Sequence, residues 1–173
     1  MNAEDLARRI KMLVCDVDGV FTDGGLYYDD LGRISKRFHV QDGLGVKVAQ
    51  KAGLDVGVIT GLESEAVRLR MLELGVGEYH AGMKNKVQLV EGICERKGLV
   101  PEQMAFLGDD WVDLGPLSRV GLPMAVANAQ PEVKAAAAWV STVPGGHGAV
   151  REAIRFILQA QGKLAQMLQE WVH

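Results

Sequence analysis

The sequence predicts an α/β fold built on a doubly wound parallel sheet. Three short apolar runs, Ile10–Val14, Leu54–Ile59 and Met104–Gly108, alternate with longer segments of helical pattern. Such runs are typical of strands buried on both faces of a parallel sheet, and their alternation with helices indicates βαβ connections. The length of 173 residues suits one hydrophobic core, so we expect a single domain over residues 1–173.

One segment breaks the alternation of strand and helix. Gly25–Tyr28 and Ile34–Val40 flank the polar turn Asp29–Arg33, which is the pattern of a β-hairpin. This insertion after the first strand, at about residues 24–40, is too short to form a domain of its own. Elsewhere, helical spacing and turn residues predict six helices and one further short strand: Gly43–Ala52, Glu63–Leu74, Lys86–Lys97, Leu114–Val120, Pro131–Ala137, Ala149–Ala160 and the strand Trp139–Thr142.

Composition excludes several classes of protein. The net charge of −3 argues against a general nucleic-acid-binding surface, which needs a basic face. The first residues lack the apolar stretch of a signal peptide, and no run approaches the roughly 18 apolar residues of a membrane span. We therefore expect a cytoplasmic protein with no nucleic-acid and no membrane partner. Cys15 and Cys94 lack the spacing of metal ligands and are expected in the core.

Two carboxylates follow the first predicted strand. Residues two apart on an extended chain point the same way, so Asp16 and Asp18 can face one pocket, while Gly19 lets the backbone turn. Two like charges this close require a cation or a shared proton, and oxygen ligands select magnesium. The alternative for an isolated Asp-x-Asp-Gly is a plain surface turn.

Other polar residues lie at the ends of later elements. Thr60 follows the second strand, Lys86 begins a predicted helix, and Asp109, Asp110 and Asp113 follow the third strand. Each has an alternative role as a helix cap or a solvated surface residue. Because the carboxyl ends of parallel strands meet in one crevice, however, we expect the whole set to share a pocket.

This ordered set resembles the four motifs of the haloacid dehalogenase (HAD) superfamily of phosphotransferases. The resemblance implies that Asp16 is the nucleophile that accepts the phosphoryl group and forms an aspartyl-phosphate. Asp18 would protonate the leaving alcohol and later activate water. The hairpin occupies the place where HAD enzymes carry their first cap, so the resemblance implies a Rossmann-like HAD fold with no cap domain. The matching residues are Asp16-Val-Asp18, Thr60, Lys86 and Gly108-Asp109-Asp110-Trp-Val-Asp113.

The remaining HAD roles concern the phosphoryl group and the metal. Thr60 and Lys86 would bind the phosphoryl oxygens, which fits a reaction that depends on positioning and charge neutralisation. Mg²⁺ would be held by the Asp16 carboxylate, the Asp18 backbone carbonyl and Asp109. Asp110 and Asp113 would orient waters or Lys86 from the second shell of ligands.

Within the superfamily, the chain resembles the small capless phosphatases of 2-keto-3-deoxy sugar acids, above all the 3-deoxy-D-manno-octulosonate 8-phosphate phosphatases of lipopolysaccharide biosynthesis. The resemblance implies a homotetramer whose hairpins form a central barrel, with a neighbouring subunit closing each site. The shared stretches are Asp16–Gly24, Lys36-x-Phe38, Gln41–Gly43, Gly108–Asp110, Gly145–Glu152 and Gln159–Gly162. The residues implied to contact the sugar acid, beside Asp18 and Lys86, are His39, Val40, Gln41, Asp42, Gly43, Lys47 and Arg70.

Leu62 departs from the family pattern. The octulosonate phosphatases typically have arginine at this position, and a related group that acts on nine-carbon keto-deoxy sugar acid phosphates usually has glutamate. A nine-carbon substrate is therefore an alternative. Alternatives of another class are a receiver-like protein, whose acidic pair precedes a separate acceptor Asp, and a catalytically inert oligomeric binding module.

The C-terminal tail, at about residues 163–173, has an amphipathic pattern. Leu164, Met167, Leu168 and Trp171 recur at helical spacing. We expect this face to dock on another subunit or to pack on its own chain.

Overall fold

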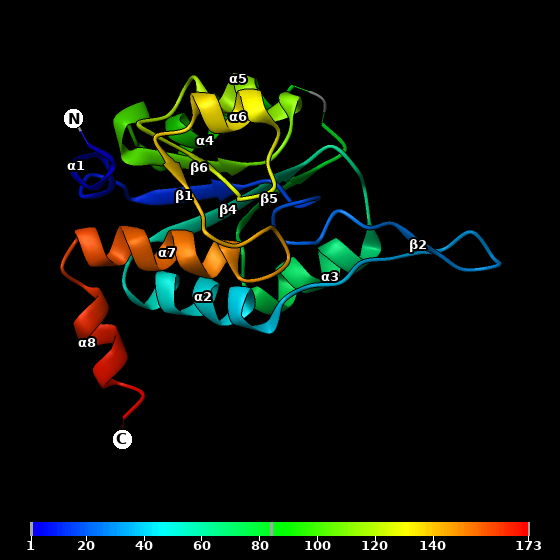
Figure 1. Ribbon diagram of the computed structural model, residues 1–173, viewed down its shortest axis with the longest axis horizontal. Coiled ribbons are helices and arrows are strands. Elements are labelled where there is room, and N and C mark those ends of the chain that lie inside the picture. The colour runs from blue at the N-terminus through cyan, green and yellow to red at the C-terminus, as the bar shows by residue number, and fades with distance from the viewer. Residues whose placement is uncertain (1, 84, 173) are drawn as a thin grey trace.

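The computed structural model describes residues 2–83 and 85–172 and shows a parallel sheet between two layers of helices (Figure 1). The sheet has the order β5-β4-β1-β6-β7-β8, and each neighbouring pair is parallel. The doubly wound α/β prediction is thus confirmed. The strands are β1 Met12–Cys15, β4 Asp55–Thr60, β5 Glu78–Ala81, β6 Met104–Gly108, β7 Leu122–Ala125 and β8 Trp139–Val140.

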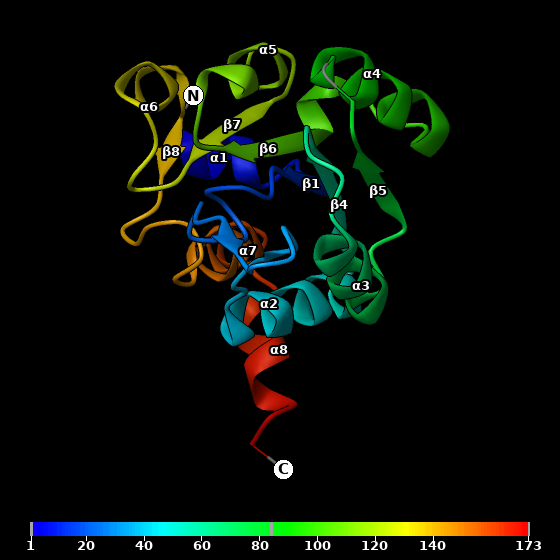
Figure 2. The same ribbon diagram turned by 90° about the vertical axis from the view of Figure 1, so that its right-hand side faces the viewer.

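Helices cover both faces of this sheet (Figure 2). On one face lie α2 Val40–Lys51, α3 Glu65–Leu74 and α7 Ala149–Ala160, and on the other lie α4 Lys86–Lys97, α5 Leu114–Leu117 and α6 Pro131–Ala136. Shorter elements are α1 Ala3–Ala7, η1 Pro101–Gln103, η2 Trp111–Asp113 and α8 Leu164–Gln169. The central strand β1 is wholly buried, as expected for a strand that is covered on both faces.

Several element boundaries differ from the sequence prediction. Helices α4 and α7 and strand β6 begin and end as predicted, whereas α2 begins at Val40 instead of Gly43. Glycines weaken a helix locally, and here packing of α2 against α7 overrides that preference. Strand β8 and helices α5 and α6 end earlier than predicted, α3 begins two residues later, and β1 is shifted to Met12–Cys15.

Besides the short 3₁₀ helices η1 and η2, three elements escaped the prediction altogether: α1, β5 and β7. Strand β5 is an edge strand with every residue half-buried, so no alternation marks it. Strand β7 contains Pro123, a residue that normally argues against an inner strand. Tertiary pairing with β6 and β8 nevertheless forms that strand.

The predicted hairpin is present but shorter than expected. Strands β2 (Tyr27–Tyr28) and β3 (Ile34–Ser35) pair antiparallel and extend away from the body (Figure 1). The Asp29 carboxylate accepts hydrogen bonds from the backbone N–H of Leu31 and of Arg33, both at 2.9 Å, and so fixes the turn. The segment after Ser35 was wrongly predicted as continuous strand up to Val40: within residues 36–39 only Phe38 forms a bridge, with Thr22, and α2 begins at Val40.

The C-terminal tail forms α8 against the rest of the chain. Met167 is buried, whereas Leu168 and Trp171 are 45% and 62% exposed, so only part of the predicted apolar face packs internally. The last residue of the tail, His173, lies outside the described residues. Among the residues that the structure describes, no helix is both long and apolar enough to cross a membrane.

Candidate active site

The candidate site begins at the loop that follows β1, Asp16–Gly19, which we call the catalytic loop. Asp16 is 5% exposed, and Gly19 adopts a φ of +86° that favours glycine. A Cβ at Gly19 would lie 2.2 Å from Asp109 Oδ2. Glycine at this position therefore allows the loop to turn and also allows the Asp109 carboxylate to approach it closely.

The loop Gly145–Gly148 presses against the catalytic loop from outside. A Cβ at Gly145 would lie 1.7 Å from the Gly19 carbonyl oxygen, so no side chain fits there. Gly146 N–H donates to the Val20 carbonyl at 2.9 Å. Close main-chain packing against residues 19–23 therefore explains Gly145 and Gly146.

Lys86 connects two carboxylates at the floor of the site. Its Nζ lies 3.0 Å from Asp16 Oδ1 and 2.7 Å from Asp113 Oδ1, and its side chain is 4% exposed. Asp113 is fully buried, and its other oxygen accepts backbone N–H groups from Asp109 at 3.0 Å and Asp110 at 3.4 Å. Both carboxylate oxygens of Asp113 thus accept hydrogen bonds from its own chain, and its contact with Lys86 fits the predicted role of orienting that lysine.

Three carboxylates approach one another closely here. Carboxylate oxygens of Asp16, Asp109 and Asp113 lie within 4.8 Å of one another. Because Asp113 already binds Lys86 and two N–H groups, Asp16 and Asp109 are the side chains left to hold a cation. Oδ1 of Asp109 is buried without a hydrogen-bond partner, which fits a ligand position for a hard divalent cation.

The electrostatics of the metal-free site follow from this crowding. Burial, followed by repulsion from Asp113, raises the pKa of Asp16 to about 6 despite the opposing effect of Lys86. Burial and the charges of Asp16 and Asp113 raise the pKa of Asp109 to about 8. For Lys86, burial alone would lower the pKa, but Asp16 and Asp113 outweigh it and raise that pKa above its ordinary value. The site therefore favours any added positive charge.

The side chains from the strand ends surround a pocket of about 400 Å³. Thr60, at the end of β4, is buried and lines this pocket. Its Oγ1 accepts the Leu62 N–H at 3.4 Å. The expected convergence of the strand ends is thus observed, with Asp113 directly behind Lys86. The lining residues are Asp16, Asp18, Thr60, Gly61, Leu62, Met83, Lys86, Asp109, Asp110 and Val112.

Lys36 is a neighbour of the site that sequence reasoning did not single out. It follows β3 of the hairpin, its side chain is 1% exposed, and its Nζ contacts Asp18 Oδ1. The two residues lie 18 positions apart, so only folding of the hairpin over the catalytic loop brings them together. The sole sequence signal was the similarity of Lys36-x-Phe38 to the octulosonate phosphatases. The contact ties the hairpin to Asp18.

Asp18 and Lys86 line this pocket, but the other residues predicted to contact the sugar acid do not line it within one chain. His39 and Val40 lie at the start of α2, where Val40 is 80% exposed, and Gln41 is also exposed. Asp42 is 1% exposed and accepts the Arg151 N–H at 2.8 Å, so it caps the start of α7. This contact gives Asp42 a structural role, although its other carboxylate oxygen is buried without a hydrogen-bond partner.

Gly43, Lys47 and Arg70 form a separate neighbourhood between α2 and α3. A Cβ at Gly43 would lie 2.2 Å from the Arg70 guanidinium, so Gly43 leaves room for this side chain. Arg70 pairs with Glu73 at 2.8 Å, and Lys47 donates to the Glu73 carbonyl at 3.0 Å. Since these residues do not line the pocket of their own chain, the prediction that they contact the substrate requires that they reach the pocket of a neighbouring subunit.

Comparison with known proteins identifies the family of this chain. Residues 76–154 match the family model described as haloacid dehalogenase-like hydrolase. The chain is also 39% identical over 158 residues to the 3-deoxy-D-manno-octulosonate 8-phosphate phosphatase KdsC of Escherichia coli (strain K12), covering 91% of this chain and 84% of that protein. This chain belongs to the haloacid dehalogenase-like hydrolases. As a haloacid dehalogenase-like hydrolase, it has the four motifs of the superfamily around one pocket.

Further relatives of this haloacid dehalogenase-like hydrolase agree. The protein of the same name from Haemophilus influenzae is 43% identical over 154 residues, covering 89% of this chain and 86% of that protein. A crystal structure of 3-deoxy-D-manno-octulosonate 8-phosphate phosphatase from Moraxella catarrhalis, in complex with a magnesium ion, a phosphate ion and a KDO molecule, matches with a TM-score of 0.95 at 32% identity. It covers 98% of this chain and 97% of that one. The predicted family resemblance is confirmed.

Proposed function

We propose that this protein is a magnesium-dependent phosphomonoesterase that hydrolyses 3-deoxy-D-manno-octulosonate 8-phosphate to 3-deoxy-D-manno-octulosonate and phosphate, in lipopolysaccharide biosynthesis. The observation that carries the proposal is the Asp16 carboxylate, which faces the pocket, touches Lys86 and lies beside the unpaired oxygen of Asp109. The likeness to the phosphatases of Escherichia coli and Moraxella catarrhalis supports the choice of substrate.

In the first step, an Asp16 carboxylate oxygen attacks the phosphorus, and the bond from phosphorus to the sugar oxygen breaks. Asp18 gives its proton to that leaving oxygen, so the sugar acid departs as a neutral alcohol. The Thr60 hydroxyl and the Lys86 ammonium donate hydrogen bonds to the phosphoryl oxygens. Asp113 keeps Lys86 directed at the pocket during this step.

In the second step, Asp18 accepts a proton from water, whose oxygen attacks the phosphorus of the aspartyl-phosphate. The acyl phosphate bond breaks, which frees the Asp16 carboxylate and leaves inorganic phosphate. The Asp16 carboxylate, the Asp18 backbone carbonyl and Asp109 would hold Mg²⁺, which supplies charge neutralisation around the transferring group. The contact of Lys36 with Asp18 keeps the acid/base carboxyl on the pocket side of the loop.

Leu62 bears on the choice of sugar. It is 50% exposed and lines both the catalytic pocket and a second hollow beneath the hairpin. An apolar side chain at this junction can contact the carbon skeleton of a sugar acid but cannot pair with its carboxylate. We infer that cationic residues elsewhere, among them Lys47 and Arg70 of a neighbouring subunit, provide that pairing. The nine-carbon keto-deoxy acid phosphate stays the second candidate.

We further propose that the protein is a homotetramer held together through its hairpins. The hairpin presents apolar side chains to solvent in one contiguous segment, and unpaired strand edges favour association with other chains. The exposed fractions are Leu26 44%, Tyr27 50%, Tyr28 65%, Leu31 76% and Ile34 40%. A cytoplasmic location stays a prediction, to be tested by cell fractionation.

The deciding experiment measures phosphate release with magnesium from three substrates: the octulosonate 8-phosphate, the nine-carbon keto-deoxy acid phosphate and an aryl phosphate. We expect the first to give the highest kcat/KM and Asp16→Asn to give almost no turnover. Preference for the nine-carbon ester would retain the chemistry and overturn the substrate. Normal turnover by Asp16→Asn would overturn the covalent mechanism, and stable phosphorylation without hydrolysis would favour the receiver-like alternative.

The assembly is tested separately by size-exclusion chromatography with light scattering. We expect a mass of four chains for the wild type and a smaller species for Tyr28→Glu, because a buried charge opposes hairpin association. Leu72→Glu, which places the same charge at an exposed apolar position of α3 outside the hairpin, is the matched control. A monomeric protein with full activity would rule out closure of the site by a neighbouring subunit.

A further inference from the structure

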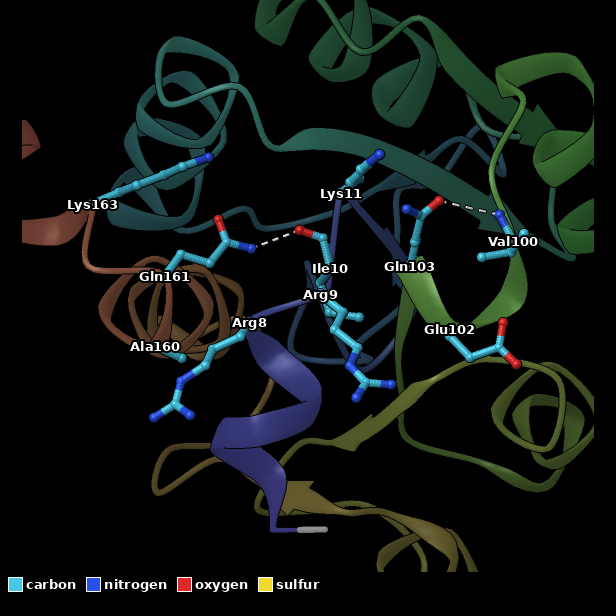
Figure 3. A pocket seen from close by; sticks show the side chains of 10 residues that line it. All are labelled: Arg8, Arg9, Ile10, Lys11, Val100, Glu102, Gln103, Ala160, Gln161 and Lys163. Atoms are coloured by element: carbon cyan, nitrogen blue, oxygen red, sulfur yellow. Dashed lines mark hydrogen bonds between the residues drawn. The ribbon is translucent and has the colours of Figure 1, made fainter.

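Another hollow, which we call the basic hollow, lies at the end of the sheet where β1 begins, and Figure 3 shows it from close by. Lys11 immediately precedes β1, whose far end leads to Asp16, so the two sites are separated by the length of the central strand. The hollow has a volume of about 820 Å³ and is bordered by the end of α1, by η1 and by the end of α7. None of its residues takes part in the proposed reaction.

The side chains around this hollow are strongly basic. Arg8, Arg9, Lys11 and Lys163 line it, and Glu102 is the one acid among its lining residues within the described part of the chain. The whole chain has a net charge of −3, so the local charge has the opposite sign. Such a concentration of cations without matching carboxylates favours an anionic ligand.

Most of these charges are free to bind a ligand. Over residues 2–83 and 85–172, neither Arg9 nor Lys11 takes part in an ion pair. Arg8 pairs with Asp5 at 3.0 Å, but its side chain is 59% exposed, and an ion pair in solvent is worth little. These three cations can therefore turn toward a ligand at small cost, whereas Lys163 would exchange its hydrogen bond to the Ala52 carbonyl, at 3.0 Å, for a ligand.

The backbone beneath these cations is held in place by hydrogen bonds. Gln161 Nε2 donates to the carbonyl of Ile10 at 2.6 Å and to that of Ala7 at 3.2 Å, which fastens the end of α7 to the basic segment. Lys11 N–H donates to the Gln103 carbonyl at 2.8 Å. The backbone that carries the basic side chains is therefore fixed before a ligand binds, which lowers the ordering cost of binding.

The placement of the cations indicates the class of ligand. Figure 3 shows the guanidinium groups of Arg8 and Arg9 on one side of Ile10 and the ammonium groups of Lys11 and Lys163 on the other, so the charged ends are spread out instead of meeting at one point. A single phosphate could reach only some of them, whereas a chain of phosphates could touch several at once. We propose that this hollow binds a small molecule that carries several linked phosphates.

The test uses inorganic triphosphate as the probe, with the full chain and without magnesium, by isothermal titration calorimetry. We expect wild-type protein to bind triphosphate at least tenfold more tightly than orthophosphate. The double variant Arg8→Gln/Arg9→Gln should weaken triphosphate binding by at least tenfold, and Lys11→Gln alone by about threefold. The matched control is Arg68→Gln/Arg155→Gln, which removes two exposed charges that do not line the hollow, and it should retain wild-type affinity.

Three outcomes would overturn the proposal: no triphosphate binding by the wild type, equal affinity for orthophosphate and triphosphate, or unchanged affinity in both the Arg8/Arg9 and the Lys11 variants. Thermal unfolding of each variant shows whether a loss of affinity reflects a loss of fold. Phosphate release from the sugar-acid ester is measured in parallel. Because the Arg8/Arg9 variant leaves the catalytic pocket intact, failure of this proposal is distinguishable from failure of the proposed enzymatic function.

Discussion

Asp109→Asn should stabilise the metal-free protein at alkaline pH and abolish its response to magnesium. The Asp109 carboxyl is crowded by Asp16 and Asp113, and one of its oxygens is buried without a partner. Burial and these charges raise its pKa from 3.8 to about 8. The folded state therefore opposes ionisation of the Asp109 carboxyl. Asparagine cannot ionise, so the variant avoids this cost at alkaline pH.

The sign and size of the effect follow from this shift. A carboxyl whose folded pKa is raised costs nothing below the unfolded pKa of 3.8, and the cost grows with pH until it is complete near pH 8. Asp16, with a pKa of about 6, contributes mainly below pH 6. Since Asp109 is only partly buried, solvent screening reduces its cost to about 2 kcal/mol, or roughly 4–8 °C in Tm for a domain of this size.

The assay is thermal unfolding of the wild type, Asp109→Asn and the exposed control Asp30→Asn at pH 6 and pH 8.5, with EDTA and with magnesium. In EDTA, we expect the wild type and the control to lose Tm between the two pH values relative to Asp109→Asn. Magnesium should raise the Tm of the wild type and the control only, since they retain the carboxylate ligand. An Asp109→Asn variant with the same pH dependence as the wild type would refute the electrostatic argument.

Three further predictions concern the catalytic loop and its neighbours. Asp16→Asn should lower kcat by about three orders of magnitude or more while the fold is retained, as measured by phosphate release and circular dichroism. Gly145→Ala should lower the free energy of unfolding by about 2–3 kcal/mol, because its methyl group would lie 1.7 Å from the Gly19 carbonyl oxygen. Gly77→Ala, with open space around it, is the control. Equal denaturant midpoints for the two variants would contradict the packing argument. Lys36→Met should lower kcat about tenfold or more with a smaller change in KM, because Asp18 loses its contact with the Lys36 ammonium. Lys36→Arg should restore part of the rate. Unaltered kcat in Lys36→Met would show that the contact does not position Asp18.

Much of the catalytic pocket could be located from the sequence because parallel strands end at one edge of a sheet. Asp16 and Asp18 follow β1, Thr60 ends β4, and Asp109 follows β6, and each of these strands is marked by a short apolar run. Recognising three buried strands was therefore enough to gather these side chains. Their catalytic roles come from the family resemblance and stay predictions.

Other features have no local signal in the sequence. The edge strand β5 and the proline-containing β7 form through pairing with neighbouring strands, so neither alternation nor propensity marks them. The pattern of the hairpin was clear, but its second strand, β3, ends at Ser35, and helix α2 begins at Val40. Boundaries of this kind depend on contacts between distant segments.

The sequence by itself determined the α/β class, the order of the principal strands and the chemical types of the residues at their ends, because these follow from local hydrophobic pattern and motif order. Only the tertiary structure decided that Lys36 reaches Asp18 and that Asp42 caps α7, and it placed Asp113 against Lys86, one of the two roles that the resemblance implied. Each of these contacts joins elements that are distant in sequence or depends on which way a buried side chain turns. Long-range packing sets both these contacts and the orientation of the buried side chains.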